Sequence, residues 1–302
     1  MSNEPNVNHK HKDSLFRMIF RDREALLSLY NAVNGSEYTD SEAITINTVE
    51  DAVYMGMKND NSFLIANYLN LFEAQSTWNP NMPLRGVFYF AALFRGYVSQ
   101  NELDLYSGTL IRLPMPQYIV FYNGTRDIGE RMELKLSESF LSEANEAVGP
   151  GMNPDSEPAL ECVVTYLNIN YGHNQEIMSR CRKLYEYSFL VEQIRRRTRT
   201  GKPIETAVDE AVRQCIREGI LADFLRRHRA EVRDVILAEY DEDLHIRNEK
   251  RISREEGKEE GALEEKKRFI RSLLQKGTFS DEELASHAQV SVEKILEIKK
   301  GL

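Results

Sequence analysis

The chain of 302 residues lacks the features that small secreted proteins and membrane-spanning proteins depend on. It has only 3 cysteines, and no two of them stand in a CxxC spacing. This argues against a disulfide framework and a cysteine zinc site, and it fits a reducing cytoplasm. No apolar run reaches the roughly 18 residues of a membrane span, and the polar N-terminal residues lack the apolar core of a secretory signal. We therefore expect a cytoplasmic protein with no membrane partner.

Two sequence motifs of common enzyme classes are also missing. No GxxxxGK[ST] loop is present, so a nucleotide cofactor is not expected, and no GxSxG segment marks a serine nucleophile. What is present is an ordinary globular composition, with 41% hydrophobic and 29% charged residues. A chain of this length and composition can bury a stable hydrophobic core without disulfide bonds or structural metal ions.

The net charge of −9 is distributed unevenly. Residues 1–177 carry 12 Lys and Arg against 23 Asp and Glu, a net charge of −11. Residues 178–233 carry 14 against 8, a net charge of +6, and most of these bases are arginines. An acidic body with a basic segment is compatible with a phosphate-binding face, and equally with a solvated helical face. Both interpretations stay open at this point.

Hydrophobic periodicity predicts an α/β organisation. One amphipathic helix is expected from Asp13 to Asn34, with Asp13 able to cap its free amides. A later segment, Leu84–Val98, is apolar nearly all round and predicts a helix buried against a sheet. The remaining expected elements are an extended segment at 44–57, hairpin strands at 63–65 and 69–75, and strands at 117–122 and 160–169. From 176 to 240 the pattern is helical throughout, with one break at 200–203.

The composition changes after Tyr240. Residues 241–268 are almost all charged and predict a linker or solvated helix. Apolar periodicity then returns, and the segment from Ser280 to Glu283 has the pattern of a capping box. We expect two parts: residues 1–240 as the main domain and residues 241–302 as a charged linker with a helical tail. The tail resembles a weak helix-turn-helix, which would bind DNA, and it equally suits an oligomerising segment that would join copies of the chain.

One strand carries an unusual combination of residues. Alternation places Glu73 and Gln75 on the same side of the strand from Leu69 to Gln75, whose other members are mostly apolar. Asp60 opens the hairpin, so antiparallel pairing can bring it close to Glu73. Two carboxylates and a backbone oxygen form a hard oxygen site that suits Mg²⁺.

Simpler interpretations of the same residues stay open. Asp60 could be a turn residue, Glu73 could form a structural salt bridge with Arg85, and Gln75 could cap the strand edge. In the YGHN segment, His173 could be a base, and a histidine with its hydrogen bonds satisfied in the core or in a turn is the simpler interpretation.

Four strings in the chain resemble the PD-(D/E)XK phosphodiesterase superfamily, in its Rpn (recombination-promoting nuclease) or putative-transposase branch. They are HKDSLFRMIF at 11–20, KNDNSFLIANYLNLFEAQSTWNPNMPLRG at 58–86, PQYIVFYNGT at 116–125 and YLNINYGHN at 166–174. The resemblance implies a restriction-endonuclease-like mixed sheet in the order αβββαβ, flanked by helices and followed by a helical C-terminal tail. It puts the acid before the hairpin at Asp60 and the ExK glutamate at Glu73. The position where the superfamily more often has lysine falls on Gln75, and the first-helix acid on Asp13.

The activity implied is that of a Mg²⁺-dependent DNA endonuclease, with Mn²⁺ as a substitute, that hydrolyses phosphodiester bonds in recombination or transposition. Asp60, Glu73 and the main-chain carbonyl near Ala74 would hold the metal, and Gln75 would orient the attacking water. The alternative is a catalytically silent protein of the same fold that binds DNA or a partner protein.

Overall fold

The computed structural model describes residues 14–46, 61–140 and 158–240, together with isolated positions between 268 and 296. The chain divides into two compact units, residues 1–240 and residues 241–302. The division falls where the composition changes after Tyr240. The two catalytic candidates Asp13 and Asp60 lie outside the described residues.

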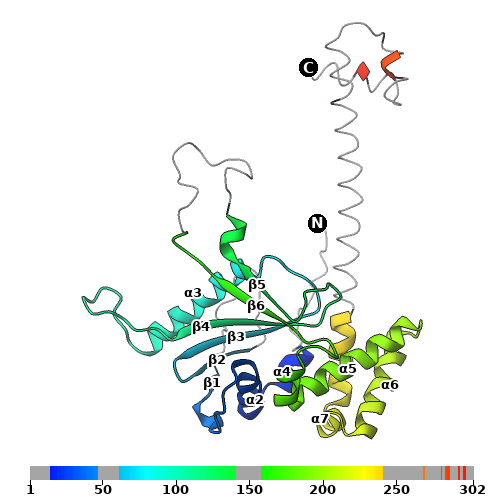
Figure 1. Cartoon of the computed structure of the whole chain (residues 1–302), viewed down its shortest axis with the longest axis horizontal. Coiled ribbons are helices and arrows are strands. Elements are labelled where there is room, and N and C mark those ends of the chain that lie inside the picture. The colour runs from blue at the N-terminus through cyan, green and yellow to red at the C-terminus, as the bar shows by residue number, and fades with distance from the viewer. Residues whose placement is uncertain are drawn as a thin grey trace, which may run out of the picture. The chain divides into compact units, whose positions relative to one another are not determined.

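The first unit is an α/β structure built on a six-stranded mixed sheet of order β1-β2-β3-β4-β6-β5 (Figure 1). The strands are β1 (Thr45–Ile46), β2 (Asn61–Ile65), β3 (Tyr68–Gln75), β4 (Met115–Tyr122), β5 (Arg131–Lys135) and β6 (Val163–Asn168). β3, β4 and β6 run parallel, and the remaining pairs are antiparallel. The expected mixed sheet flanked by helices is confirmed.

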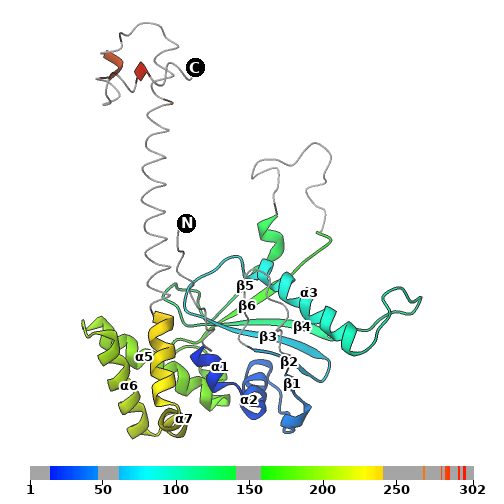
Figure 2. The same cartoon turned by 180° about the vertical axis from the view of Figure 1, so that it is seen from behind.

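Helices cover both faces of this sheet (Figures 1 and 2). They are α1 (Leu15–Ile19), α2 (Arg23–Asn34), α3 (Met82–Gln100), α4 (Gln175–Arg180), α5 (Arg182–Arg199), α6 (Ile204–Glu218) and α7 (Ala222–Arg227), and residues 229–240 are also helical. Short 3₁₀ turns lie at Ser41–Ala43 and Leu136–Ser139. Among the described residues, the elements from α2 to β4 follow the order helix, three strands, helix, strand.

The two faces bury different clusters of side chains. One face packs Phe72, Phe121 and Leu167 against α1, α2, α4 and α5. The other packs Leu71, Tyr118 and Tyr166 against α3. Since neighbouring residues of a strand point to opposite faces, the alternation along β3 decides which side chains meet α3.

The structure differs from the expectations at three places. The helical segment predicted from 176 to 240 with one break at 200–203 is also interrupted at Cys181, at residues 219–221 and at His228. The single helix predicted from Asp13 to Asn34 is two helices, because the Asp22 side chain accepts a hydrogen bond of 2.7 Å from the Ala25 amide and caps the start of α2. The N-cap of α1 is Ser14, whose hydroxyl accepts from Arg17 N at 3.1 Å. β5 has no counterpart among the expected strands.

In the second unit, described positions test one prediction. The Ser280 hydroxyl accepts a hydrogen bond of 3.2 Å from Glu283 N, and the Glu283 carboxylate accepts one of 2.8 Å from Ser280 N. This reciprocal pair is the predicted capping box.

Candidate functional site

The β2–β3 hairpin positions Glu73 and Gln75 as the alternation predicts. Its register pairs Asn61 with Phe72 and Ile65 with Tyr68, so the turn is formed by Ala66 and Asn67. The odd-numbered residues of β3 face α3, which puts Glu73 and Gln75 on one side. Gln75 Nε2 donates to Glu73 Oε2 at 3.4 Å. The two side chains are therefore neighbours at the C-terminal end of β3.

Glu73 is almost completely buried, with 2% of its surface exposed. Burying a carboxylate is costly unless a cation or hydrogen bonds compensate its charge. Arg85, on the first turns of α3, places Nη2 3.5 Å from Glu73 Oε2. The salt bridge that the sequence offered as an alternative for Glu73 is thus present in the structure.

Arg85 is itself held in place by its neighbours. Its Nη2 donates to the Tyr89 hydroxyl at 2.6 Å, and its Nη1 lies 3.3 Å from Met82 Sδ. Burial acts to lower the pKa of Arg85, but the charge of Glu73, the hydrogen bond to Tyr89 and the charges of Tyr89 and Tyr118 together raise it. The guanidinium is therefore a permanent counter-charge to Glu73.

Three tyrosines surround the ion pair. Burial raises the pKa of Tyr89 to about 12, and the charge of Glu73 adds to the rise. The same two causes raise the pKa values of Tyr118 on β4 and Tyr166 on β6. The Tyr166 hydroxyl donates to Asn79 O at 2.8 Å and so ties β6 to the loop before α3.

These phenols give the site a measurable dependence on alkaline pH. An unfolded tyrosine ionises near pH 10, whereas Tyr89 in the fold keeps its proton to about pH 12. The unfolded state thus loses its proton at a lower pH than the folded state does. The contribution of Tyr89 to the free energy of unfolding is therefore fully present below pH 10, and it falls as the pH rises towards 12. We expect Tyr89→Phe to make this fall shallower by up to roughly 1.4 kcal/mol per pH unit.

Urea unfolding between pH 9 and 12 measures this slope. Tyr106→Phe is the matched control, because Tyr106 is 98% exposed and lies outside this cluster of tyrosines. Equal slopes in the two variants would show that folding does not change the pKa of Tyr89.

The metal site expected from the sequence is described only in part. Hard oxygen donors at the end of β3 are the Glu73 carboxylate, the Gln75 amide oxygen and the main-chain carbonyl at Ala74. They supply only one of the two carboxylates that the sequence predicts. Among the described residues, no group of three His, Cys, Asp or Glu could hold a metal ion. The second carboxylate of the predicted site, Asp60, lies outside the described residues. The described part of the hairpin begins at Asn61, which pairs with Phe72, the residue before Glu73.

The arginines of α5–α7 are mostly engaged within the protein. Ion pairs with Asp or Glu involve Arg182, Arg196, Arg197, Arg199 and Arg226. Arg233, in the helical residues 229–240, pairs with Asp209. Several of these pairs link residues three or four positions apart on one helix. For these side chains, a solvated helical face is the simpler interpretation of the basic segment.

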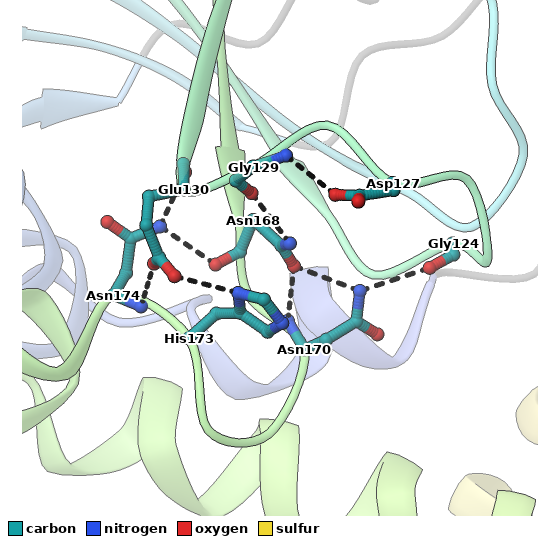
Figure 3. Close-up of polar contacts among 8 residues, drawn as sticks. All are labelled: Gly124, Asp127, Gly129, Glu130, Asn168, Asn170, His173 and Asn174. Atoms are coloured by element: carbon teal, nitrogen blue, oxygen red, sulfur yellow. Dashed lines mark hydrogen bonds and ion pairs between the residues drawn. The ribbon is translucent and has the colours of Figure 1, made fainter.

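A polar network joins two loops at the carboxyl ends of β4 and β6 (Figure 3). Asn168 and Asn170 donate from their side-chain amides to Gly129 O at 2.8 Å and Gly124 O at 3.0 Å. His173 Nδ1 lies 2.8 Å from Glu130 Oε1, and the Asn174 amide of the same loop lowers the pKa of Glu130. His173 is thus a partnered turn histidine, in agreement with the sequence interpretation.

Comparison with known proteins adds no family to these observations: no family model, curated protein or solved structure matches the chain. No described helix is long and apolar enough to cross a membrane.

Proposed function

We propose that this chain is a metal-dependent DNA endonuclease with a PD-(D/E)XK-type core. The observation that carries the proposal is the end of β3, where a carboxylate with 2% of its surface exposed stands beside an amide on one side of the strand. This strand runs parallel to β4, and its hairpin partner begins one residue after Asp60. The element order from α2 to β4 agrees with the core implied by the sequence resemblance.

Each residue has a proposed role. Asp60 and Glu73 bind Mg²⁺ or Mn²⁺, with the main-chain carbonyl near Ala74 as a third ligand, and Gln75 orients the attacking water. The bound metal supplies a polarised phosphoryl oxygen and a water of lowered pKa. Arg85 fixes the orientation of Glu73 and balances its charge. The place of Asp13 in the site is part of the resemblance alone.

The biological setting follows from the same resemblance. We place the activity in recombination or transposition, in the cytoplasm, with DNA as the partner. The 3 cysteines are free and buried, which suits a reducing compartment. The tail after residue 241 remains a candidate for DNA binding or for homo-oligomerisation.

A second function is favoured by one observation. Arg85 supplies an intramolecular counter-charge for Glu73, so the burial of this carboxylate is explained without a metal. In a catalytically silent protein of the same fold, which binds DNA or a partner protein, this ion pair alone would account for the buried Glu73.

Plasmid nicking with Mg²⁺ and with Mn²⁺ tests the proposal. We expect the wild-type protein to convert supercoiled DNA to the open circle and Asp60→Asn to lose this activity, because one of two carboxylates at the metal is removed. Asp234→Asn is the control for an exposed carboxylate outside the site. Calorimetric titration with Mn²⁺ separates the two functions, because the endonuclease must bind the metal. Absence of Mn²⁺ binding together with absence of nicking would contradict the proposal and support the silent protein.

A further inference from the structure

The chain has 1 tryptophan, Trp78, and it lies in the loop between β3 and α3. Arg126, in the loop between β4 and β5, places its guanidinium carbon 4.2 Å from the centre of the Trp78 ring. Such a stack is attractive, and it holds a side chain that would otherwise sample many rotamers. The two loops follow neighbouring parallel strands, so the pair lies at the carboxyl edge of the sheet.

The backbone around Arg126 is fixed by close contacts between these loops. Asn123 N donates to Gln75 O at 3.0 Å, and Arg126 N donates to the Tyr122 hydroxyl at 3.0 Å. A Cβ atom on Gly124 would lie 2.3 Å from Ser76 O, so only glycine allows the loops to approach this closely. Arg126 is therefore presented from a rigid loop.

The network of Figure 3 fixes the same loop from the other side. Asn170 binds the carbonyl of Gly124 and Asn168 binds that of Gly129, on either side of Arg126. Asp127, the acidic neighbour of Arg126, accepts a hydrogen bond of 2.9 Å from Gly129 N. Its carboxylate thus caps the loop.

Arg126 is on the same side of the sheet as Glu73. The Trp78 ring packs against the ring of Tyr166 at 5.1 Å between centroids, and Tyr166 belongs to the cluster beneath α3. The register pairs Gln75 with Tyr122, whose hydroxyl binds the Arg126 amide. A strand of nucleic acid bound at Glu73 and Gln75 would pass this edge.

The guanidinium is available for a ligand. Arg126 is exposed, and among the described residues it forms no ion pair, unlike many arginines of α5–α7. Trp78 covers one face of the Arg126 guanidinium plane. The N–H groups at the edge of that plane stay accessible. These groups suit the oxygens of a phosphate.

We propose that Arg126, stacked on Trp78, binds a backbone phosphate of DNA and positions the strand at the Glu73–Gln75 edge. The inference rests on the proposed function for the identity of the ligand. Its contribution is positioning, because a phosphate contact carries no base-sequence information.

The test uses the full chain, a fluorescein-labelled 20-base-pair duplex and EDTA, so that binding is measured without cleavage. Anisotropy gives the affinity, and unlabelled duplex is used to follow the fluorescence of Trp78, the single tryptophan. The variants are Arg126→Ala, Arg126→Lys and Arg131→Ala. Arg131 is the matched control, because it is an exposed arginine that already pairs with Glu133.

We expect Arg126→Ala to weaken binding about tenfold, and the slope of log affinity against log salt to fall by about one. Arg126→Lys should recover part of the loss, since it keeps the charge without the planar fork. Arg131→Ala should stay within about twofold of wild type. Duplex binding should change the Trp78 fluorescence.

Equal affinity of Arg126→Ala and Arg131→Ala would overturn the inference, as would saturating duplex with unchanged Trp78 fluorescence. Its failure is distinct from failure of the proposed function. Binding with the expected pattern but no nicking in Mg²⁺ would support the phosphate contact and contradict the endonuclease. Nicking by wild type together with unaltered binding by Arg126→Ala would support the endonuclease and contradict the phosphate contact.

Discussion

Replacing Glu73 by Gln is expected to lower the rate of plasmid nicking at least about a hundredfold, because the carboxylate that we propose as a metal ligand becomes a neutral amide of the same size. The amide oxygen can still accept a hydrogen bond from Arg85. Nicking is measured at one protein concentration in Mg²⁺ and in Mn²⁺. Glu133→Gln serves as the control, since Glu133 is an exposed carboxylate on β5 with 46% of its side chain accessible. Nicking at the wild-type rate would contradict the assignment of Glu73.

The stability of Glu73 variants must be measured beside their activity. If Asp60 and Glu73 are neighbours, their carboxylates repel each other, and Glu73→Ala would stabilise the fold in the absence of metal. The structure adds an opposing effect, because Arg85 has 21% of its side chain exposed and loses its counter-charge when Glu73 is removed. We therefore prefer Glu73→Gln to Glu73→Ala, and urea unfolding shows whether lost cleavage reflects lost structure.

The hairpin was predictable because its signals are local. Phe63 to Ile65 and Leu69 to Gln75 are short apolar segments on either side of a turn at Asn67, and a period of two then fixes which residues share a face. The C-terminal end of α2 was equally clear, since Gly35 takes a left-handed conformation with φ of 65° after Asn34. In both places, neighbouring residues carry the whole signal.

The break between α1 and α2 and the strand β5 were not predictable in this way. Both helices bury their apolar residues in one cluster, so the helical period runs through the break without interruption. Its cause is the Asp22 cap, which a pattern of apolar residues does not show. β5 has the sequence RMELK, whose residues favour helices, and it becomes a strand by pairing with β6.

Half of the candidate site was visible in the sequence. The pair Glu73 and Gln75 followed from alternation, and Arg85 was named as a partner of Glu73. The three tyrosines were missed because they come from α3, β4 and β6, far apart in the chain. One signal was available, because Arg85 and Tyr89 stand four residues apart on a helix and must be neighbours. The Trp78–Arg126 stack joins two loops and has no such signal.

The second large effect concerns Arg85. Arg85→Met should lower the free energy of unfolding by about 3–5 kcal/mol, because it leaves the buried carboxylate of Glu73 without its cation. Guanidinium chloride unfolding at 25 °C measures this loss. Arg95→Met is the control, since Arg95 is exposed on the same helix. A loss no larger than that of the control would mean that the ion pair does not compensate the burial of Glu73.

The double variant Glu73→Leu with Arg85→Met is expected to recover most of that stability. Replacing both members of a buried ion pair by apolar groups of similar volume removes the desolvation cost together with the attraction. The same variant separates the two proposed functions, because it lacks the carboxylate without leaving a buried charge behind. If it is as stable as wild type but no longer nicks plasmid, Glu73 is needed for the reaction and not for the fold.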